Sequence, residues 1–142
     1  MSKLKGLVVL ILVVAVIGGG AMFYLKKDLI FGPETEKAIT AEELAELSID
    51  TDIITTNLAS ASNFAIVQFN ILLSSEETKI EAENRTAEVR AAIISTMASF
   101  TKDQLAGKEG IVNLEQELSS KLGNIVQTGK VERVLVTEFK VQ

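Results

Sequence analysis

Cysteine and histidine are both absent from the 142 residues of this chain. Their absence excludes thiol nucleophiles, disulfide bonds, imidazole bases and the usual zinc ligands. It also excludes membrane attachment through a lipid-modified cysteine. Proline is scarce as well, since Pro33 is the only one in the chain. The length favours a single folded domain.

Acidic residues are missing from the beginning of the chain. All 19 of them lie from Asp28 onward, where they outnumber the 10 lysines and arginines of the same segment. Such a negative segment repels the phosphate backbone of nucleic acids and, more weakly, anionic lipid headgroups. We therefore expect no nucleic-acid partner.

What the chain has instead is one long apolar run. Residues 7–25 read LVVLILVVAVIGGGAMFYL, which is 19 residues without a charge. As a helix this run would span roughly 28 Å, close to the hydrocarbon core of a bilayer. We predict a cytoplasmic tail at 1–6, a transmembrane helix at 7–25 and a juxtamembrane stalk at 26–50. The residues expected to form the anchor are Leu7, Leu10, Val14, Ile17, Phe23, Tyr24 and Leu25.

An apolar run can also be a buried core helix or a cleaved signal peptide. A core helix does not fit, because the run is apolar on every face and a core helix is amphipathic. A signal peptide stays open as an alternative, since Lys3 and Lys5 precede the run. The run continues past its glycines to Leu25 without a clean cleavage motif, which favours an uncleaved anchor. The short tail favours an N-terminus on the inside.

A patch of small residues lies within the predicted anchor. Ala15, Gly18 and Gly19 would let a second membrane helix approach closely. Glycine is also commonly tolerated in membrane helices without any such contact. We favour ordinary tolerance over a helix-packing role for these residues.

The segment after the anchor alternates between strand and helix patterns. Thr40 and Glu43 form a capping box for a short helix within the stalk. The predicted strands are 51–59, 63–73 and 131–142, and the first two are expected to pair antiparallel through a turn at 61–63. The predicted helices are 76–100, opened by a Ser74 and Glu77 box, and 109–127, ended by Gly129. Between them we expect a short helical turn at 101–107, opened by Thr101 with Gln104 three residues on and closed by Gly107.

Apolar periodicity defines the expected core. The strand at 63–73 places Ala65, Val67, Phe69, Ile71 and Leu73 on one face, and the helix at 109–127 has a stripe that consists of Ile111, Leu114, Leu118, Leu122 and Ile125. Two or three helices would then pack on one face of a small antiparallel sheet. The predicted fold class is α+β, with residues 51–142 as one domain after a single transmembrane helix.

No arrangement of residues predicts catalysis. Carboxylate pairs such as Glu77 and Glu81 fall on predicted solvent faces, where neither partner would be desolvated for acid–base work. Asp50 and Asp52 begin like a calcium loop, but the required glycine and glutamate do not follow. We expect no enzyme activity, no cofactor and no metal, and we expect the chain to act through contacts with partners.

The second half of the chain resembles the FliL family of bacterial flagellar basal-body-associated proteins. The ending VERVLVTEFKVQ is similar to the closing strand of that family at Thr137, Glu138, Phe139 and Gln142. The segment DQLAGKEGIVNLEQELSSKLGNIVQTGKVERV and the segment RTAEVRAAIIS are similar to it as well. The resemblance covers the layout of the whole chain and is most specific over residues 85–142.

The resemblance implies a fold and a role. The domain would resemble the stomatin-like (SPFH) fold and form a homo-oligomeric ring. That ring would contact the MotA/MotB stator beside the basal body and support torque, motility or swarming. The protein would lie in the bacterial cytoplasmic membrane with residues 51–142 outside the cytoplasm. The alternatives are a non-flagellar membrane scaffold of the same fold, a cell-envelope adhesin or sensor, and a domain secreted after signal cleavage.

Overall fold

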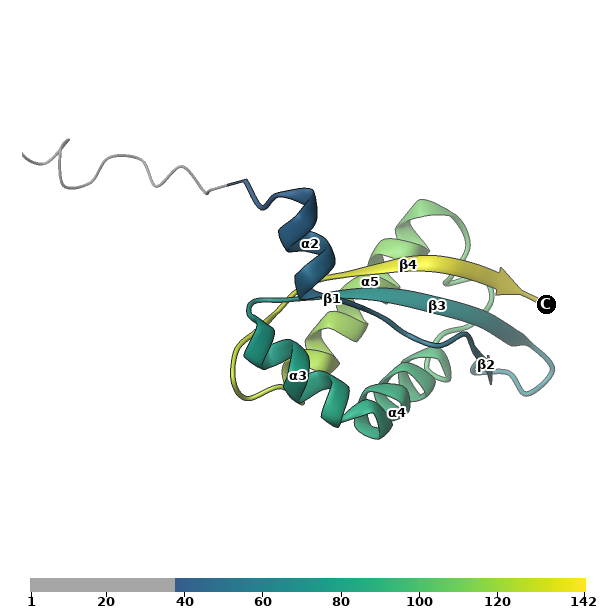
Figure 1. Ribbon diagram of the computed structural model, residues 1–142. Helices are drawn as coiled ribbons and strands as arrows, with labels where there is room; N and C mark the ends of the chain where they lie inside the picture. The colour runs from purple at the N-terminus through teal and green to yellow at the C-terminus, as the bar shows by residue number, and fades with distance from the viewer. Residues whose placement is uncertain (1–37) are drawn as a thin grey trace, which may run out of the picture. The chain divides into compact units, whose positions relative to one another are not determined.

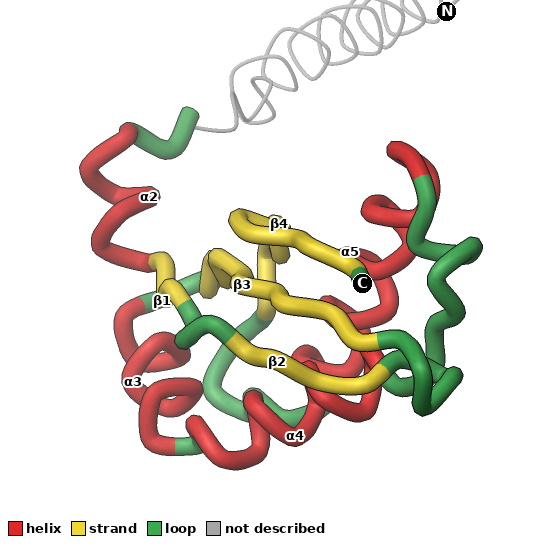
Figure 2. The backbone as a smooth tube through the Cα atoms, turned by 90° about the vertical axis from the view of Figure 1, so that its right-hand side faces the viewer, coloured by secondary structure: helices red, strands yellow, loops and turns green. Residues whose placement is uncertain are grey.

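Strand β3 (Phe64–Leu73) is the centre of a four-stranded antiparallel sheet. The computed structural model describes residues 38–142, and residues 39–142 form one compact unit. Strand β4 (Val131–Val141) pairs with β3 along one edge. Strands β1 (Ser48–Asp50) and β2 (Ile54–Asn57) follow one another along the other edge. Figure 2 shows this arrangement, with β3 between β4 and the two short strands.

Three helices cover one face of the sheet (Figure 1). They are α3 (Glu76–Asn84), α4 (Thr86–Met97) and α5 (Gly107–Gly123). A fourth helix, α2 (Ala41–Leu47), precedes β1 and lies beside α3, where the Lys79 ammonium donates a hydrogen bond of 2.8 Å to the Glu46 carbonyl. The arrangement confirms the predicted α+β class, with helices on one face of a small antiparallel sheet. The predicted anchor residues and the patch of Ala15, Gly18 and Gly19 lie outside the described residues.

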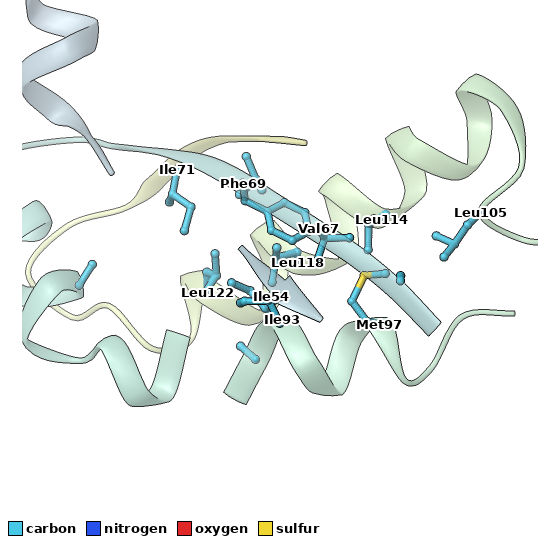
Figure 3. Close-up of a cluster of buried hydrophobic side chains, with 14 of the residues drawn as sticks. Ile54, Val67, Phe69, Ile71, Ile93, Met97, Leu105, Leu114, Leu118 and Leu122 are labelled. Carbon is cyan, nitrogen blue, oxygen red and sulfur yellow. The ribbon is translucent and has the colours of Figure 1, made fainter. Parts of the chain in front are cut away.

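The core fills the space between β3 and the three helices, as Figure 3 shows. All five residues expected on the inner face of β3 are buried, and so are Leu114, Leu118 and Leu122 of the predicted α5 stripe. Ile93 and Met97 of α4 complete this layer from below. The helices therefore pack through the apolar stripes that periodicity predicted.

Two local predictions about helix ends are confirmed. The Thr40 side chain accepts a hydrogen bond from the Glu43 N–H while the Glu43 carboxylate accepts one from the Thr40 N–H, which is the capping box of α2. Thr101 and Gln104 make the same reciprocal pair in the turn before α5. Gly107 closes that turn with a φ of 74°, a value that favours glycine.

The predicted helix at 76–100 is in fact two helices. Arg85 leaves helical geometry, with φ −100° and ψ 28°, and its N–H is shared between the Glu81 and Ala82 carbonyls. The Thr86 hydroxyl donates to the Glu83 carbonyl, which takes up an acceptor of the last turn of α3. The predicted Ser74 and Glu77 box is also wrong, because α3 is capped one residue later by Ser75.

Other predicted strands and helices extend beyond the observed ones. The strand expected at 51–59 is only β2, while β1 lies upstream of it and within the segment taken for the stalk. The helix expected to run to residue 127 ends at Gly123. The glycine expected to end it, Gly129, instead packs against α3, since a Cβ there would lie 2.2 Å from the Thr78 hydroxyl.

Candidate interaction surfaces

The C-terminal strand β4 contains a β-bulge at the family-like T-E-F motif. Gln68 of β3 is opposite Glu138, but the next residue, Phe69, is opposite Val136, so Thr137 has no partner. An extra residue in one strand reverses which side chains face the core. Val134 and Val136 face it before the bulge, and Phe139 and Val141 face it afterwards. The sequence pattern puts Leu135, Thr137, Phe139 and Val141 on one alternating face, and this prediction is wrong before the bulge, where Leu135 is exposed.

The four residues singled out on β4 have different surroundings. Thr137 is exposed, while Phe139 is partly buried and packs against the core. The Glu138 carboxylate is 2.8 Å from the Lys140 ammonium, and this hydrogen bond and charge raise the pKa of Lys140. Gln142 exchanges two backbone hydrogen bonds with Phe64, at 2.9 and 3.0 Å. These residues fasten the end of β4 to the sheet and form no cluster of converging polar groups.

The outer edge of β4 is partly covered by α5. The Glu115 carboxylate on α5 accepts a hydrogen bond of 2.9 Å from the Val136 N–H, next to the bulge. An unpaired strand edge presents backbone donors and acceptors on which another chain can add. Glu115 accepts the hydrogen bond of one of these donors. Within residues 38–142, β4 pairs with no strand besides β3.

A carboxylate clasp joins the loop after α5 to the α3–α4 break. One oxygen of Glu81 accepts hydrogen bonds from the Gln127 N–H, the Thr128 N–H and the Thr128 hydroxyl, at 2.8 to 2.9 Å. The other lies 3.0 Å from Arg85 Nε. The Thr128 and Gln127 N–H bonds, together with the Thr128 hydroxyl and Arg85, lower the pKa of Glu81 to about 2. The charge pattern of the sequence predicted only a plain solvent face here, so this role of Glu81 was missed.

A cleft of about 170 Å³ opens beside the β1–β2 edge. It lies between that edge and the α3–α4 break, and its lining contains apolar and charged residues from both sides. The apolar part is contributed by Ile49, Ile54, Ile71, Ala82, Val89 and Ile93. Sequence reasoning did not predict this cleft, because it forms where the two strands are interrupted and the two helices meet.

The described residues offer no arrangement for catalysis or metal binding. Within residues 38–142 no three acidic side chains converge to hold a metal ion. No side-chain nitrogen or oxygen that is buried in this part of the chain lacks a hydrogen-bond partner. No helix in the described part is long and apolar enough to cross a bilayer.

Comparison with known proteins identifies the family to which this domain is similar. The family described as flagellar basal body-associated protein FliL matches residues 49–142. The chain is 34% identical to the flagellar protein FliL of Bacillus subtilis over 116 residues, which are 80% of this chain and 82% of that protein.

The chain belongs to the FliL family. It is thus a flagellar protein associated with the basal body, and its role is structural and not enzymatic. It is also 28% identical to the flagellar protein FliL of Aquifex aeolicus over 88 residues, or 61% of this chain and 55% of that protein. The family match includes β1 to β4, so the bulge, the Glu81 clasp and the cleft all lie within the FliL region.

Proposed function

We propose that this FliL protein is a single-pass membrane protein whose outer domain forms a ring that contacts the MotA/MotB stator. Residues 7–25 supply the anchor, with the N-terminus in the cytoplasm and the domain outside it. The ring supports torque, motility or swarming. The observation that carries the proposal is family membership over residues 49–142, joined to an uncharged run of 19 residues ahead of it.

The ring requires a surface that meets a different surface on the next copy. A contact of this heterologous kind closes into a ring when the rotation between copies allows it. The outer edge of β4, with its outward-facing Leu135, and the α4–α5 pair on the other face of the sheet supply two candidate surfaces. Ile94 on α4, Val112 on α5 and Leu135 on β4 are each 37–38% exposed. Apolar side chains that are open in one copy gain stability when a second copy covers them.

The stomatin-like fold belongs to this proposal as well. A small antiparallel sheet with helices on one face agrees with such a fold, and the described unit has this arrangement. A sheet that is covered on one face only leaves the second face and one edge for neighbours in a ring.

The test of the proposal is the position of the protein in the cell. A fluorescently tagged copy should form foci at labelled basal bodies, and the foci should be lost when the stator is deleted. Foci that remain at basal bodies without the stator would contradict the stator contact but would support the basal-body role. An even membrane distribution in flagellated cells would contradict the proposal and favour a general membrane scaffold.

Two further measurements separate the remaining alternatives. The mass of the mature protein distinguishes an anchor from a signal peptide, because cleavage would remove roughly the first 20 residues. Sedimentation of the full-length protein in detergent tests the ring. A strict monomer at high concentration, with no larger species after cross-linking in membranes, would contradict it.

A further inference from the structure

The cleft beside β1 and β2 exists because the edge of the sheet is interrupted there. Strand β1 ends at Asp50 and β2 begins at Ile54, and the chain between them is held to β3 mainly by Thr51. The Thr51 N–H donates to the Phe69 carbonyl, and its hydroxyl accepts from the Phe69 N–H. Figure 2 shows the two strands in succession along one edge, with α3 and α4 beneath.

The floor of the cleft is part of the hydrophobic core. Ile54, Ile71 and Ile93 line it and are each at most 3% exposed. Its volume, about 170 Å³, is close to that of an apolar cavity that accepts benzene, which is ~150 Å³. The cleft thus has room for one aliphatic side chain from outside.

The rim of the cleft is acidic. Asp50, Asp52 and Glu83 are its carboxylates, and Arg90 is its one cation. Asp50 accepts a hydrogen bond from Asn70, whereas among residues 38–142 neither Asp52 nor Glu83 has an ion pair. The neighbouring groove between α2 and α3 adds Glu46 and Glu76, against Lys79. The field around the cleft therefore favours a cation beside the apolar floor.

We propose that this cleft binds a basic segment of a partner protein, one that inserts an aliphatic side chain and places a lysine or arginine next to Asp52 and Glu83. The site is separate from the β4 edge and the α4–α5 pair, which we propose for the ring. Apolar burial supplies most of the affinity, and the acidic rim selects the partner.

A second copy of this chain is a less suitable occupant. Residues 38–142 contain 16 acidic and 9 basic residues, so the acidic rim of the cleft gives no attraction for a second copy. A two-fold contact at the cleft would also place one acidic rim against another. A basic partner is attracted by the same field.

The experiment uses the full-length protein in nanodiscs of zwitterionic lipid and a fluorescein-labelled probe peptide, Gly-Lys-Leu-Lys-Gly. Fluorescence anisotropy should show saturable binding. The matched peptide with serine in place of leucine should bind about tenfold more weakly, since it fills no part of the floor. Carbodiimide cross-linking should join the peptide lysines to Asp52 or Glu83.

Variants of the protein complete the test. Asp52→Lys should weaken binding up to about fivefold, and the double variant with Glu83→Lys should weaken it further. Glu117→Lys, which makes the same charge change on an exposed part of α5, should not. Ala82→Met should fill the floor and reduce binding of the leucine peptide selectively.

Two results would overturn the proposal. In the first, the leucine and serine peptides bind equally, or Glu117→Lys weakens binding as much as Asp52→Lys does. In the second, Asp52→Lys changes the sedimentation of the protein but not peptide binding, so the cleft is a contact between copies. Neither result depends on basal-body localisation, so this proposal can fail while the proposed function stands.

Discussion

Glu81 was expected on a solvent-exposed face of a helix, but its side chain lies in different surroundings. Its side chain is 13% exposed, and it joins α3 to the loop that leads into β4. Because three donors of that loop converge on one oxygen, the charged form is favoured in the folded state. The hydrogen bonds that hold the loop at Gln127 and Thr128 are therefore strongest when Glu81 is ionised.

Glu81 makes stability depend on pH in a defined window. Its folded pKa of about 2 is below the ordinary value of 4.5, so its contribution is complete above pH 4.5 and is lost as the pH falls toward 2. Glu81→Gln should be less stable than the parent protein at pH 7, and this difference should shrink below pH 4.5. Urea unfolding of both proteins from pH 7 to pH 2.5 measures it. Glu117→Gln is the control, and an equal pH profile for the two variants would contradict the role of Glu81.

Gly110 is a second residue whose importance comes from a close approach. It is buried in the first turn of α5, where an added Cβ would lie 2.5 Å from the Gln104 carbonyl oxygen. Since that neighbour is backbone, Gly110→Ala should cost ~1–3 kcal/mol of unfolding free energy. Gly123→Ala, with no atom within 4 Å of its Cβ, should be close to neutral. Thermal unfolding compares the two, and equal stabilities would show that the turn before α5 adjusts freely.

At the scale of elements, α5 depends on a narrow apolar stripe. Leu114 and Leu118 are fully buried against β3 and β4, whereas Val112 is 38% exposed. Leu118→Ala should therefore destabilise the domain by ~2–5 kcal/mol, through lost burial and the cavity left behind. Val112→Ala should change stability by less than ~0.5 kcal/mol. Chemical denaturation measures the unfolding free energy of each variant. Similar losses of unfolding free energy in both would mean that α5 packs differently.

The Glu115 side chain supplies the hydrogen bond between α5 and the edge of β4. Glu115→Ala should leave the Val136 N–H without its acceptor, at a cost of ~1 kcal/mol, and should speed hydrogen exchange at Val136. Glu115→Gln keeps an acceptor oxygen and should retain most of the protection. Exchange that is equally fast in both variants would indicate that charge, and not the acceptor, protects this edge.

For the whole molecule, the membrane anchor that we propose at residues 7–25 has the most direct consequence. We expect deletion of residues 7–25 to move the protein from the membrane fraction to the soluble fraction, because those residues form the long, almost wholly apolar run of the sequence. Immunoblots of fractionated cells measure this. The anchor assignment would be wrong if the shortened protein stayed in carbonate-washed membranes.

Much of this domain could be predicted from local patterns in the sequence. Alternation along 63–73 identified the central strand and its buried face, and the 3–4 spacing of leucines identified the inner stripe of α5. The Thr40 and Glu43 pair marked the start of α2. These features are local, since a strand or helix displays its own period and a cap involves residues three apart. The absence of cysteine and histidine likewise excluded whole classes of chemistry.

Tertiary contacts decided the rest. At the helix break Arg85 pairs with Glu81, which itself accepts a hydrogen bond from a loop 46 residues further along the chain. The bulge at Thr137 depends on how β4 aligns with β3, and no residue type signals it. The cleft forms only where an interrupted strand edge meets the α3–α4 break. Each of these requires groups that are distant in sequence to meet, so the composition and periodicity of any one segment could not contain them.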